Sequence, residues 1–316
     1  MWKGDNRMIL NTGKRTDIPA FYAKWFANRL KAGNVMVRNP YYPRIVTEYQ
    51  LSPDVIDIIC FCTKNPEPMF PYMDLLDPYR QFWFVTITPY GRDIEPHVPD
   101  KWKVMDSFRK LSERGGRSHV SWRYDPIFIS EKYSIAYHMR AFETMCSYLE
   151  GYTDSVVISF LDLYQKTKKN FPEGREVSEN DMHLIGKKFK EISEKHHMIL
   201  RTCLEDHGLG RYGIDVSGCM TREVLEQAVH EQLHVPSGHE TREGCHCLSG
   251  NDIGAYNTCM HGCKYCYANY DDSLVCENAG KHDPDSPLLV GHLHKDDEGR
   301  KAVQKSWITG QLSLDL

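Results

Sequence analysis

The sequence lacks a long hydrophobic run and an excess of basic residues, and both absences narrow what the chain can do. None of its 316 residues belongs to a run of about eighteen apolar residues, so we expect no membrane-spanning helix. A formal net charge of -4 gives no overall basic field, which disfavours a zinc-stabilised nucleic-acid-binding module. The first eight residues lack the apolar stretch of a signal peptide, and no internal repeat or low-complexity tract occurs. We therefore expect a cytoplasmic globular protein.

Cysteine is the residue that stands out, with 11 copies. In a chain without a secretion signal, cysteines are expected as metal ligands and buried thiols more than as disulfides. Cys259, Cys263 and Cys266 form a C-x3-C-x2-C pattern, with Tyr265 directly before the last cysteine. Thiolates at this spacing can bind three corners of a cubane cluster from one loop and leave the fourth iron open to a substrate or cofactor. The pattern predicts a [4Fe–4S] cluster.

The remaining cysteines leave alternatives open. A zinc knuckle would need a fourth ligand, which Cys245, Cys247, His246 or His261 could supply. A second site, with zinc or another cluster, could be formed by Cys203, Cys219, Cys245 and Cys247. If Cys245 or Cys247 instead completes the first cluster, the open iron is lost and the protein becomes an electron carrier. We interpret Cys60, Cys62, Cys146 and Cys276 as ordinary thiols, with Cys60 and Cys62 on one face of a buried strand.

Short apolar segments alternate with amphipathic helical patterns over the first two thirds of the chain. The predicted strands are Met8–Asn11, Asn34–Val37, Val55–Cys62, Phe82–Ile87, His119–Trp122, Ser155–Phe160 and Met198–Cys203. The predicted helices are Pro19–Lys31, Asp100–Arg114, Ile135–Leu149, Glu179–His196 and Thr221–Leu233. This alternation indicates parallel strands with helical crossovers, and hence an α/β fold. A (β/α) barrel, complete or partial, is the first interpretation, and an open doubly wound sheet is its main rival.

The composition divides the chain into three parts. We expect a (β/α) barrel-like domain over residues 8–235, a cysteine-rich cluster-binding module over 240–275, and a wrapping tail over 276–316. Polar clusters follow nearly every predicted strand. Because the carboxyl ends of parallel barrel strands open onto one face, we expect their side chains to share one cavity beside the cluster. The residues expected there are Arg15, Asp17, Arg38, Lys64, Arg123, Asp125, Asp162 and Glu205.

Five motifs carry a family resemblance that spans nearly the whole chain. The segments Arg15–Tyr22, Val37–Pro40, Thr63–Pro66, Trp122–Pro126 and Asp252–Asn269 resemble the uncharacterised prokaryotic family known as domain of unknown function 1848. The cysteine segment of that family is similar to the cluster loop of radical S-adenosylmethionine enzymes, in particular spore photoproduct lyase. The resemblance implies that Cys259, Cys263 and Cys266 ligate three irons, and that Tyr265 is the aromatic residue of the loop.

The resemblance also implies that S-adenosylmethionine is bound. Glu205 or Asp162 could hold its amine, and Arg15, Arg38 or Arg123 its carboxylate, with Asp17 and Tyr265 in the same cofactor site. Catalytic roles are expected for Lys64, Arg123, Asp125, Asp162 and Glu205. Two features depart from the radical enzymes. Their cluster loop follows the first barrel strand, and a Gly-Gly-Glu segment holds the methionine amine, whereas here Gly115-Gly116 is followed by Arg117. Either the barrel is permuted, with Ile253–Asn257 as its first strand, or a separate module covers its open face.

These observations predict a radical S-adenosylmethionine-type enzyme that receives electrons from a ferredoxin or flavodoxin. The alternative is a redox or structural iron–sulfur protein without radical chemistry. The last six residues, Gln311–Leu316, resemble the short peptides by which bacterial replication and repair proteins dock onto the sliding clamp. That partner would connect the enzyme to DNA repair or modification. The other interpretation of this segment is a C-terminal strand whose leucines pack on the domain itself.

Overall fold

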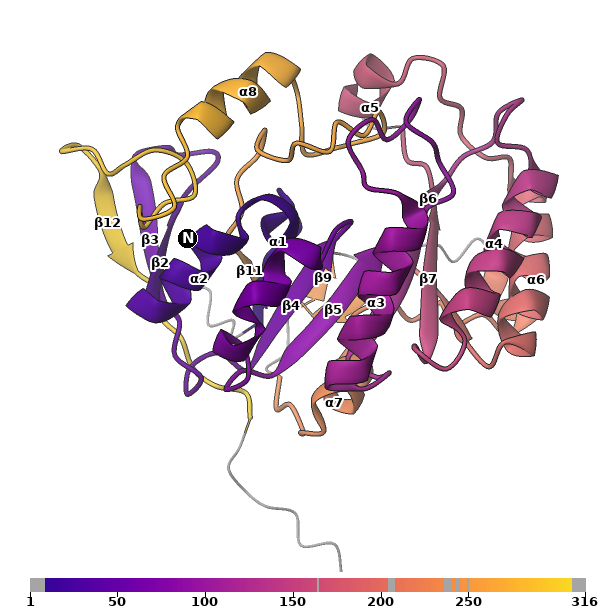
Figure 1. Ribbon diagram of the computed structural model, residues 1–316, viewed down its shortest axis with the longest axis horizontal. Coiled ribbons are helices and arrows are strands. Elements are labelled where there is room, and N and C mark those ends of the chain that lie inside the picture. The colour runs from indigo at the N-terminus through magenta and orange to yellow at the C-terminus, as the bar shows by residue number, and fades with distance from the viewer. Residues whose placement is uncertain are drawn as a thin grey trace, which may run out of the picture.

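A sheet of seven parallel strands lies at the centre of the protein (Figure 1). The computed structural model describes residues 9–163, 165–203, 208–235, 240–242, 245–248 and 250–308. The strands are β1 (Ile9–Asn11), β4 (Ile58–Thr63), β5 (Gln81–Thr86), β6 (Val120–Ile127), β7 (Ser155–Phe160), β8 (Ile199–Thr202) and β11 (Asn251–Asp252). Every neighbouring pair runs parallel. The predicted α/β fold is confirmed.

The strand order is β11-β1-β4-β5-β6-β7-β8, which follows the chain except for β11. This late strand pairs in parallel with β1, with Leu10 opposite Asn251 and Asn11 opposite Asp252. Within the described residues the sheet is open, and β8 and β11 are its two edges. Apart from β11, each connection between these strands returns the chain to the neighbouring position in the sheet.

Alternation along the strands creates two hydrophobic cores, one on each face of the sheet. Along β4, Ile59 and Phe61 face the larger core, whereas Ile58 and Cys60 face the smaller one, with Cys62 packed against it. Cys60 and Cys62 therefore share a face, as the sequence predicts. The larger core is covered by α1 (Ile18–Phe21), α2 (Ala23–Ala32), α3 (Lys101–Gly115), α4 (Ile135–Leu149) and α6 (Glu179–Lys195).

The smaller core is covered by the segment after β8. Its helix α7 (Arg222–Val229) places Val224, Leu225 and Ala228 against β5, and Trp307 joins them from near the end of the described chain. The remaining elements are the 3-10 helices η1 (Glu67–Leu75) and η2 (Leu209–Tyr212), the helices α5 (Gln165–Asn170) and α8 (Asp272–Gly280), and the hairpin of β9 (Glu240–Arg242) and β10 (Cys245–Leu248). Among the described residues, no helix is long and apolar enough to cross a membrane.

A separate three-stranded sheet corrects one of the strand assignments. The segment expected as the second barrel strand is β2 (Asn34–Arg38), which pairs antiparallel with β3 (Ile45–Gln50), while β12 (Glu298–Lys301) adds to the other side of β3. Figure 1 shows this sheet beside the main one, below α8. The sequence Ile-Val-Thr-Glu-Tyr-Gln of β3 and the fully polar β12 have no marked apolar pattern, so neither strand is predicted.

Candidate functional site

The cysteine loop directly follows β11, so it lies at the carboxyl edge of the sheet next to the end of β1. Three hydrogen bonds fix its shape. The Asn269 amide nitrogen donates to the Cys259 carbonyl at 2.7 Å, and the Asn257 N–H, at φ +55°, donates to the Ala268 carbonyl at 3.1 Å. The Tyr22 hydroxyl donates to the Thr258 carbonyl at 2.6 Å. The loop is thus closed at its base and tied to the start of α2.

The far side of the loop contacts the segment that follows β5. The Lys264 N–H donates to the Ile94 carbonyl at 3.0 Å, and the His97 N–H donates to the His261 carbonyl at 3.1 Å. Gly262 has φ +66°, and a Cβ there would lie 3.2 Å from the His97 ring. A side chain at this position would meet both backbone strain and a neighbour, so the glycine between His261 and Cys263 is required.

The three thiols of the loop act on one another electrostatically, which places them close together. Burial, with Asp17 and Cys266 adding to it, raises the pKa of Cys259 well above its ordinary value. Burial also raises the pKa of Cys263 to about 12, against the opposing charge of Lys64. Within the described residues, no three His, Cys, Asp or Glu side chains surround a position for a single metal ion. A cubane cluster spreads its thiolates over separate irons, so it needs a wider arrangement than one ion does.

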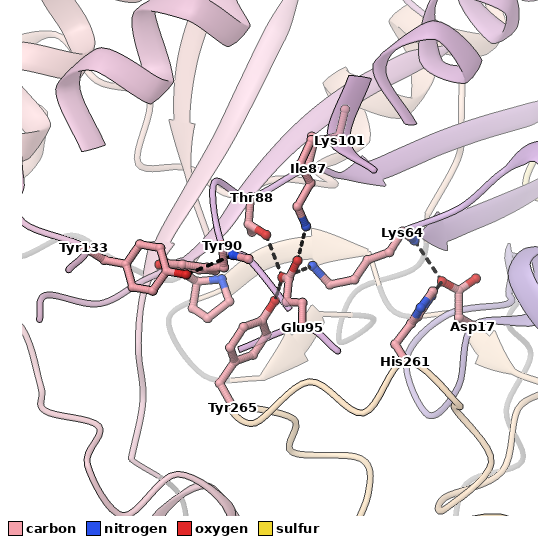
Figure 2. A network of polar contacts seen from close by, with 12 residues as sticks. Asp17, Lys64, Ile87, Thr88, Tyr90, Glu95, Lys101, Tyr133, His261 and Tyr265 are labelled. Carbon is pink, nitrogen blue, oxygen red and sulfur yellow. Dashed lines mark hydrogen bonds and ion pairs between the residues drawn. The ribbon is translucent and has the colours of Figure 1, made fainter. Parts of the chain in front are cut away.

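A buried carboxylate, Glu95, lies at the centre of the polar network in Figure 2. It accepts hydrogen bonds from Lys64 Nζ at 2.8 Å and from the Thr88 hydroxyl at 2.6 Å. It also accepts from Lys101 Nζ and from the hydroxyl of Tyr265 in the cysteine loop. All four donors converge on a residue that is 1% exposed, so the network is fixed by the fold.

Two lysines set the charge of this network. Burial opposes ionisation of Glu95, but Lys64 and Lys101 outweigh it and lower the pKa of Glu95 to about 2. Burial together with the charges of Glu95 and Cys263 raises the pKa of Tyr265 well above its usual value, so its hydroxyl keeps its proton and donates. Two ammonium groups facing one carboxylate leave one net positive charge beside Cys263.

Asp17 links the loop to the first helix. One carboxylate oxygen caps α1 through the Ala20 N–H at 3.0 Å, and the other accepts the Lys64 N–H at 2.8 Å. That second oxygen also accepts from His261 Nε2 at 2.9 Å. The other ring nitrogen, His261 Nδ1, is buried and has no hydrogen-bond partner within the described structure, and the same holds for the Asn269 amide oxygen. Such atoms beside the thiols are suited to a bound polar group.

Two further ion pairs lie at the carboxyl edge of the sheet. Arg15 Nε donates to Asp252 Oδ1 at 3.0 Å, which joins the loop after β1 to the end of β11. Arg123 Nε donates to Asp125 Oδ2 at 3.1 Å, and Asp125 also accepts from Ser159. Asp125 and Lys64 act on each other electrostatically. The Arg123–Asp125 pair on β6 therefore interacts with the charges of the Glu95 network through Lys64.

Most of the strand-end residues expected from the sequence are brought to this edge. They are Arg15, Asp17, Lys64, Arg123 and Asp125, together with Tyr265, Cys259, Cys263 and Cys266. Arg38 is a correction. It pairs with Asp297 at 2.8 Å in the three-stranded sheet, because β2 turns back on β3 and does not enter the parallel sheet. Asp162 follows β7 and is exposed. Glu205 and the Cys245 side chain lie outside the described residues, as does Gln311–Leu316.

Three important residues were missed by the sequence interpretation: Glu95, Lys101 and Asp252. Glu95 is the seventh residue after Thr88 in irregular chain, and Lys101 begins a helix whose polar positions look solvated. Neither has a local pattern that marks it as buried. Asp252 is the first residue of the Asp252–Asn269 segment, but its pairing with Arg15 depends on the register of β11 on β1, which the sequence does not reveal.

These features define an α/β protein with a parallel sheet and a cysteine loop at the carboxyl edge. The chain matches the family model described as "Domain of unknown function (DUF1848)" over residues 9–268, and it belongs to that family. No curated protein matches it. Among solved structures it is similar to "Crystal structure of D-hydantoinase", at 10% identity and a TM-score of 0.33, over 77% of this chain and 53% of that one. The chain thus spans about half the length of that protein. A likeness this weak indicates nothing about the function of this chain.

Proposed function

We propose that the protein is a radical S-adenosylmethionine-type enzyme whose [4Fe–4S] cluster is ligated by Cys259, Cys263 and Cys266. The position of the cysteine loop carries this proposal. It follows β11, which pairs in parallel with β1 and so stands ahead of β1 in the spatial order. With β11 counted as the first strand, the sheet would be a permuted partial barrel. The loop then follows the first strand, as it does in the radical enzymes that the cysteine motif resembles.

The surrounding residues suit such a cluster. Its thiolate ligands are anionic, and the net positive charge of Lys64, Lys101 and Glu95 lies beside Cys263. The unpartnered polar atoms of His261 and Asn269 belong to the same loop. When bound, the cluster would supply the electron for reductive cleavage of the S-adenosylmethionine sulfonium, which yields a hydrogen-abstracting radical.

The residues of the chain have separate tasks in this proposal. The guanidinium of Arg123 or Arg15 offers planar, bidentate recognition of the methionine carboxylate. Asp125 and Lys64 act on each other across the edge, and they are our candidates for contact with the substrate. Glu95 holds the Tyr265 hydroxyl and thereby fixes the loop between Cys263 and Cys266. Asp162 and Glu205 stay predictions as partners of the methionine amine.

The test is anaerobic reconstitution of the full chain with iron and sulfide, followed by S-adenosylmethionine and a strong reductant. We expect 5′-deoxyadenosine and methionine, and we expect neither from the Cys259→Ala, Cys263→Ala, Cys266→Ala triple variant. Cys276→Ala is the matched control, because Cys276 is an exposed thiol on α8. A triple variant that retains the full iron content would remove the basis of the proposal.

A second candidate function, a redox or structural iron–sulfur protein, is favoured by His261. Histidines that bind metals commonly donate their other ring N–H to a carboxylate, as His261 does to Asp17. If His261 Nδ1 supplied a fourth ligand, no iron would be open. The electron paramagnetic resonance spectrum of the reduced cluster separates the two functions. A spectrum that changes when S-adenosylmethionine is added supports an open iron. A spectrum that changes with S-adenosylmethionine only in the His261→Ala variant supports a cluster whose fourth iron is bound by His261.

The partners proposed for this enzyme follow from its chemistry and its tail. A ferredoxin or flavodoxin would supply the electron. Docking of Gln311–Leu316 onto a bacterial sliding clamp, and with it a role in DNA repair or modification, would direct the radical chemistry to DNA. Binding of the full chain to a purified clamp, compared with a Gln311→Ala, Leu314→Ala variant, tests this partner. Equal binding by both chains would exclude the tail as the docking segment.

A further inference from the structure

Three cysteines from distant parts of the chain meet on the other side of the sheet edge. Cys203 follows β8, Cys219 precedes α7, and Cys247 lies in β10. The sulfur of Cys219 is 3.7 Å from that of Cys203 and 3.6 Å from that of Cys247. All three belong to or pack against the smaller core, away from the cysteine loop described above. Contact between sulfur atoms from three separate segments indicates that the fold brings these thiols together to form a site.

The backbone around Cys247 is shaped to receive its sulfur. The N–H groups of Cys219 and Met220 both donate to Cys247 Sγ at 3.2 Å. Two backbone donors therefore fix the position of this sulfur. Gly218 makes this approach possible, since it has φ +129° and a Cβ there would lie 2.9 Å from the same sulfur. A buried cysteine that only fills space needs neither feature.

A positive charge lies near two of the three thiols. The guanidinium of Arg123 acts on Cys203 and Cys219, and it is held in place by Asp125. A cavity of about 510 Å³ lies alongside, lined by Ser217 and Thr221 on either side of Cys219 and by His246 next to Cys247.

We propose that Cys203, Cys219 and Cys247 bind a single thiophilic cation of the Zn²⁺ class. Zinc–thiolate bonds of about 2.3 Å at tetrahedral angles place neighbouring sulfurs about 3.8 Å apart, close to both separations seen here. Cys219 already contacts both of the other thiols. Because no three such side chains in the described part of the chain yet surround one point, Cys203 and Cys247 must turn towards each other when the ion binds. The free energy of zinc binding to thiolates exceeds the cost of two cysteine rotations.

The position of the site suggests what the ion does. Cys203 comes directly after β8, and β10, which contains Cys247, leads into β11. The strands β8 and β11 are the two edges of the open sheet, and the described residues show no strand pairing between them. An ion bound here would connect the two edges where hydrogen bonds do not. This role is independent of the cluster and of the reaction proposed above.

The test uses the Cys259→Ala, Cys263→Ala, Cys266→Ala chain, so that only the second site can hold metal. We expect about one equivalent of Zn²⁺ by elemental analysis, and tetrahedral cobalt–thiolate absorption when Co²⁺ replaces it. Adding Cys219→Ala or Cys247→Ala should weaken Co²⁺ binding by at least about tenfold. Cys146→Ala, which removes a buried thiol from the larger core, should leave it unchanged.

A second measurement uses no substitution at Cys203, Cys219 or Cys247, so it does not depend on whether such a variant folds. In the same chain, Zn²⁺ should slow alkylation of Cys203, Cys219 and Cys247 by at least about tenfold, and a chelator should restore the rate. Absence of bound metal, equal binding after loss of Cys219, or a disulfide from Cys219 in place of metal would each overturn the proposal.

Discussion

Replacing Glu95 with glutamine tests the network at the sheet edge most directly. The substitution keeps the size of the side chain and removes its charge, so Lys64 and Lys101 lose their shared counterion in a site where Glu95 is 1% exposed. Removing one partner of a buried ion pair costs about 3–5 kcal/mol, because the remaining charge is left uncompensated. The pKa of Glu95, lowered from 4.5 to about 2, gives a similar order, about 3 kcal/mol.

The loss should depend on pH. The carboxyl of Glu95 has a lower pKa in the folded than in the unfolded chain, so its stabilisation is fully present above about pH 4.5 and is lost as the pH falls towards about 2. We therefore expect Glu95→Gln to lower the free energy of unfolding by about 3 kcal/mol at pH 7, with a Tm lower by roughly 4–6 °C. The difference from the unsubstituted chain should shrink below about pH 4.5.

Thermal and urea unfolding, followed by circular dichroism at several pH values, measure both effects. Glu173→Gln is the matched control, because Glu173 forms an exposed ion pair with Lys264 at 2.9 Å. Exposed pairs contribute about 0–1 kcal/mol, so this variant should stay close to the unsubstituted chain. A Glu95→Gln variant that loses less than about 1 kcal/mol at neutral pH, or whose deficit is unchanged in acid, would refute the argument that charge holds this network.

Two further substitutions test the packing that positions the site. Gly250→Ala should destabilise the protein by about 1–3 kcal/mol, because the new Cβ would lie 2.2 Å from Asn11 Nδ2 and 2.7 Å from the Ile9 carbonyl. Gly299→Ala, at a position with open space, is its control, and equal unfolding midpoints for the two would contradict the contact of β11 with β1. Phe142→Ala should cost about 3–5 kcal/mol in urea unfolding, because this ring stacks on Phe189 at 3.7 Å in the larger core. Leu274→Ala, at an exposed position, should change stability by less than about 0.5 kcal/mol.

The sequence predicts six of the seven parallel strands, because each of these is a short, mostly buried apolar run. The seventh, β11, is the polar pair Asn251–Asp252, and the segment expected as a first strand, Ile253–Asn257, directly follows it. Ser155–Phe160 and Ile135–Leu149 are found with the predicted bounds as β7 and α4. The assignment of β2 to that sheet is wrong for a topological reason. An apolar strand pattern records burial but not the partner, and the polar β3 that follows gives no sign of a hairpin.

The site is predicted in part for a similar reason. Charged residues directly after strands, such as Lys64 and Arg123, are brought together because parallel strands share an edge. Glu95 lies in irregular chain, where position relative to the sheet is set by tertiary contacts with Lys64 and Tyr265. Its burial follows from those contacts, and no local pattern encodes them. The meeting of Cys203, Cys219 and Cys247 likewise depends on how the segment after β8 folds back over the sheet.

A single line of alternating charges joins the two groups of thiols. Glu95 pairs with Lys64, Lys64 acts on Asp125, and Asp125 pairs with Arg123. At one end, Lys64 also acts on Cys263 in the cysteine loop, and at the other, Arg123 acts on Cys203 and Cys219. Charge placed on either group of thiols therefore changes the field at the other through side chains that are largely buried, where screening by salt is weak. The charges of the edge therefore couple the cluster proposed for the loop to the cation proposed for Cys203, Cys219 and Cys247, although the two have separate ligands and separate roles.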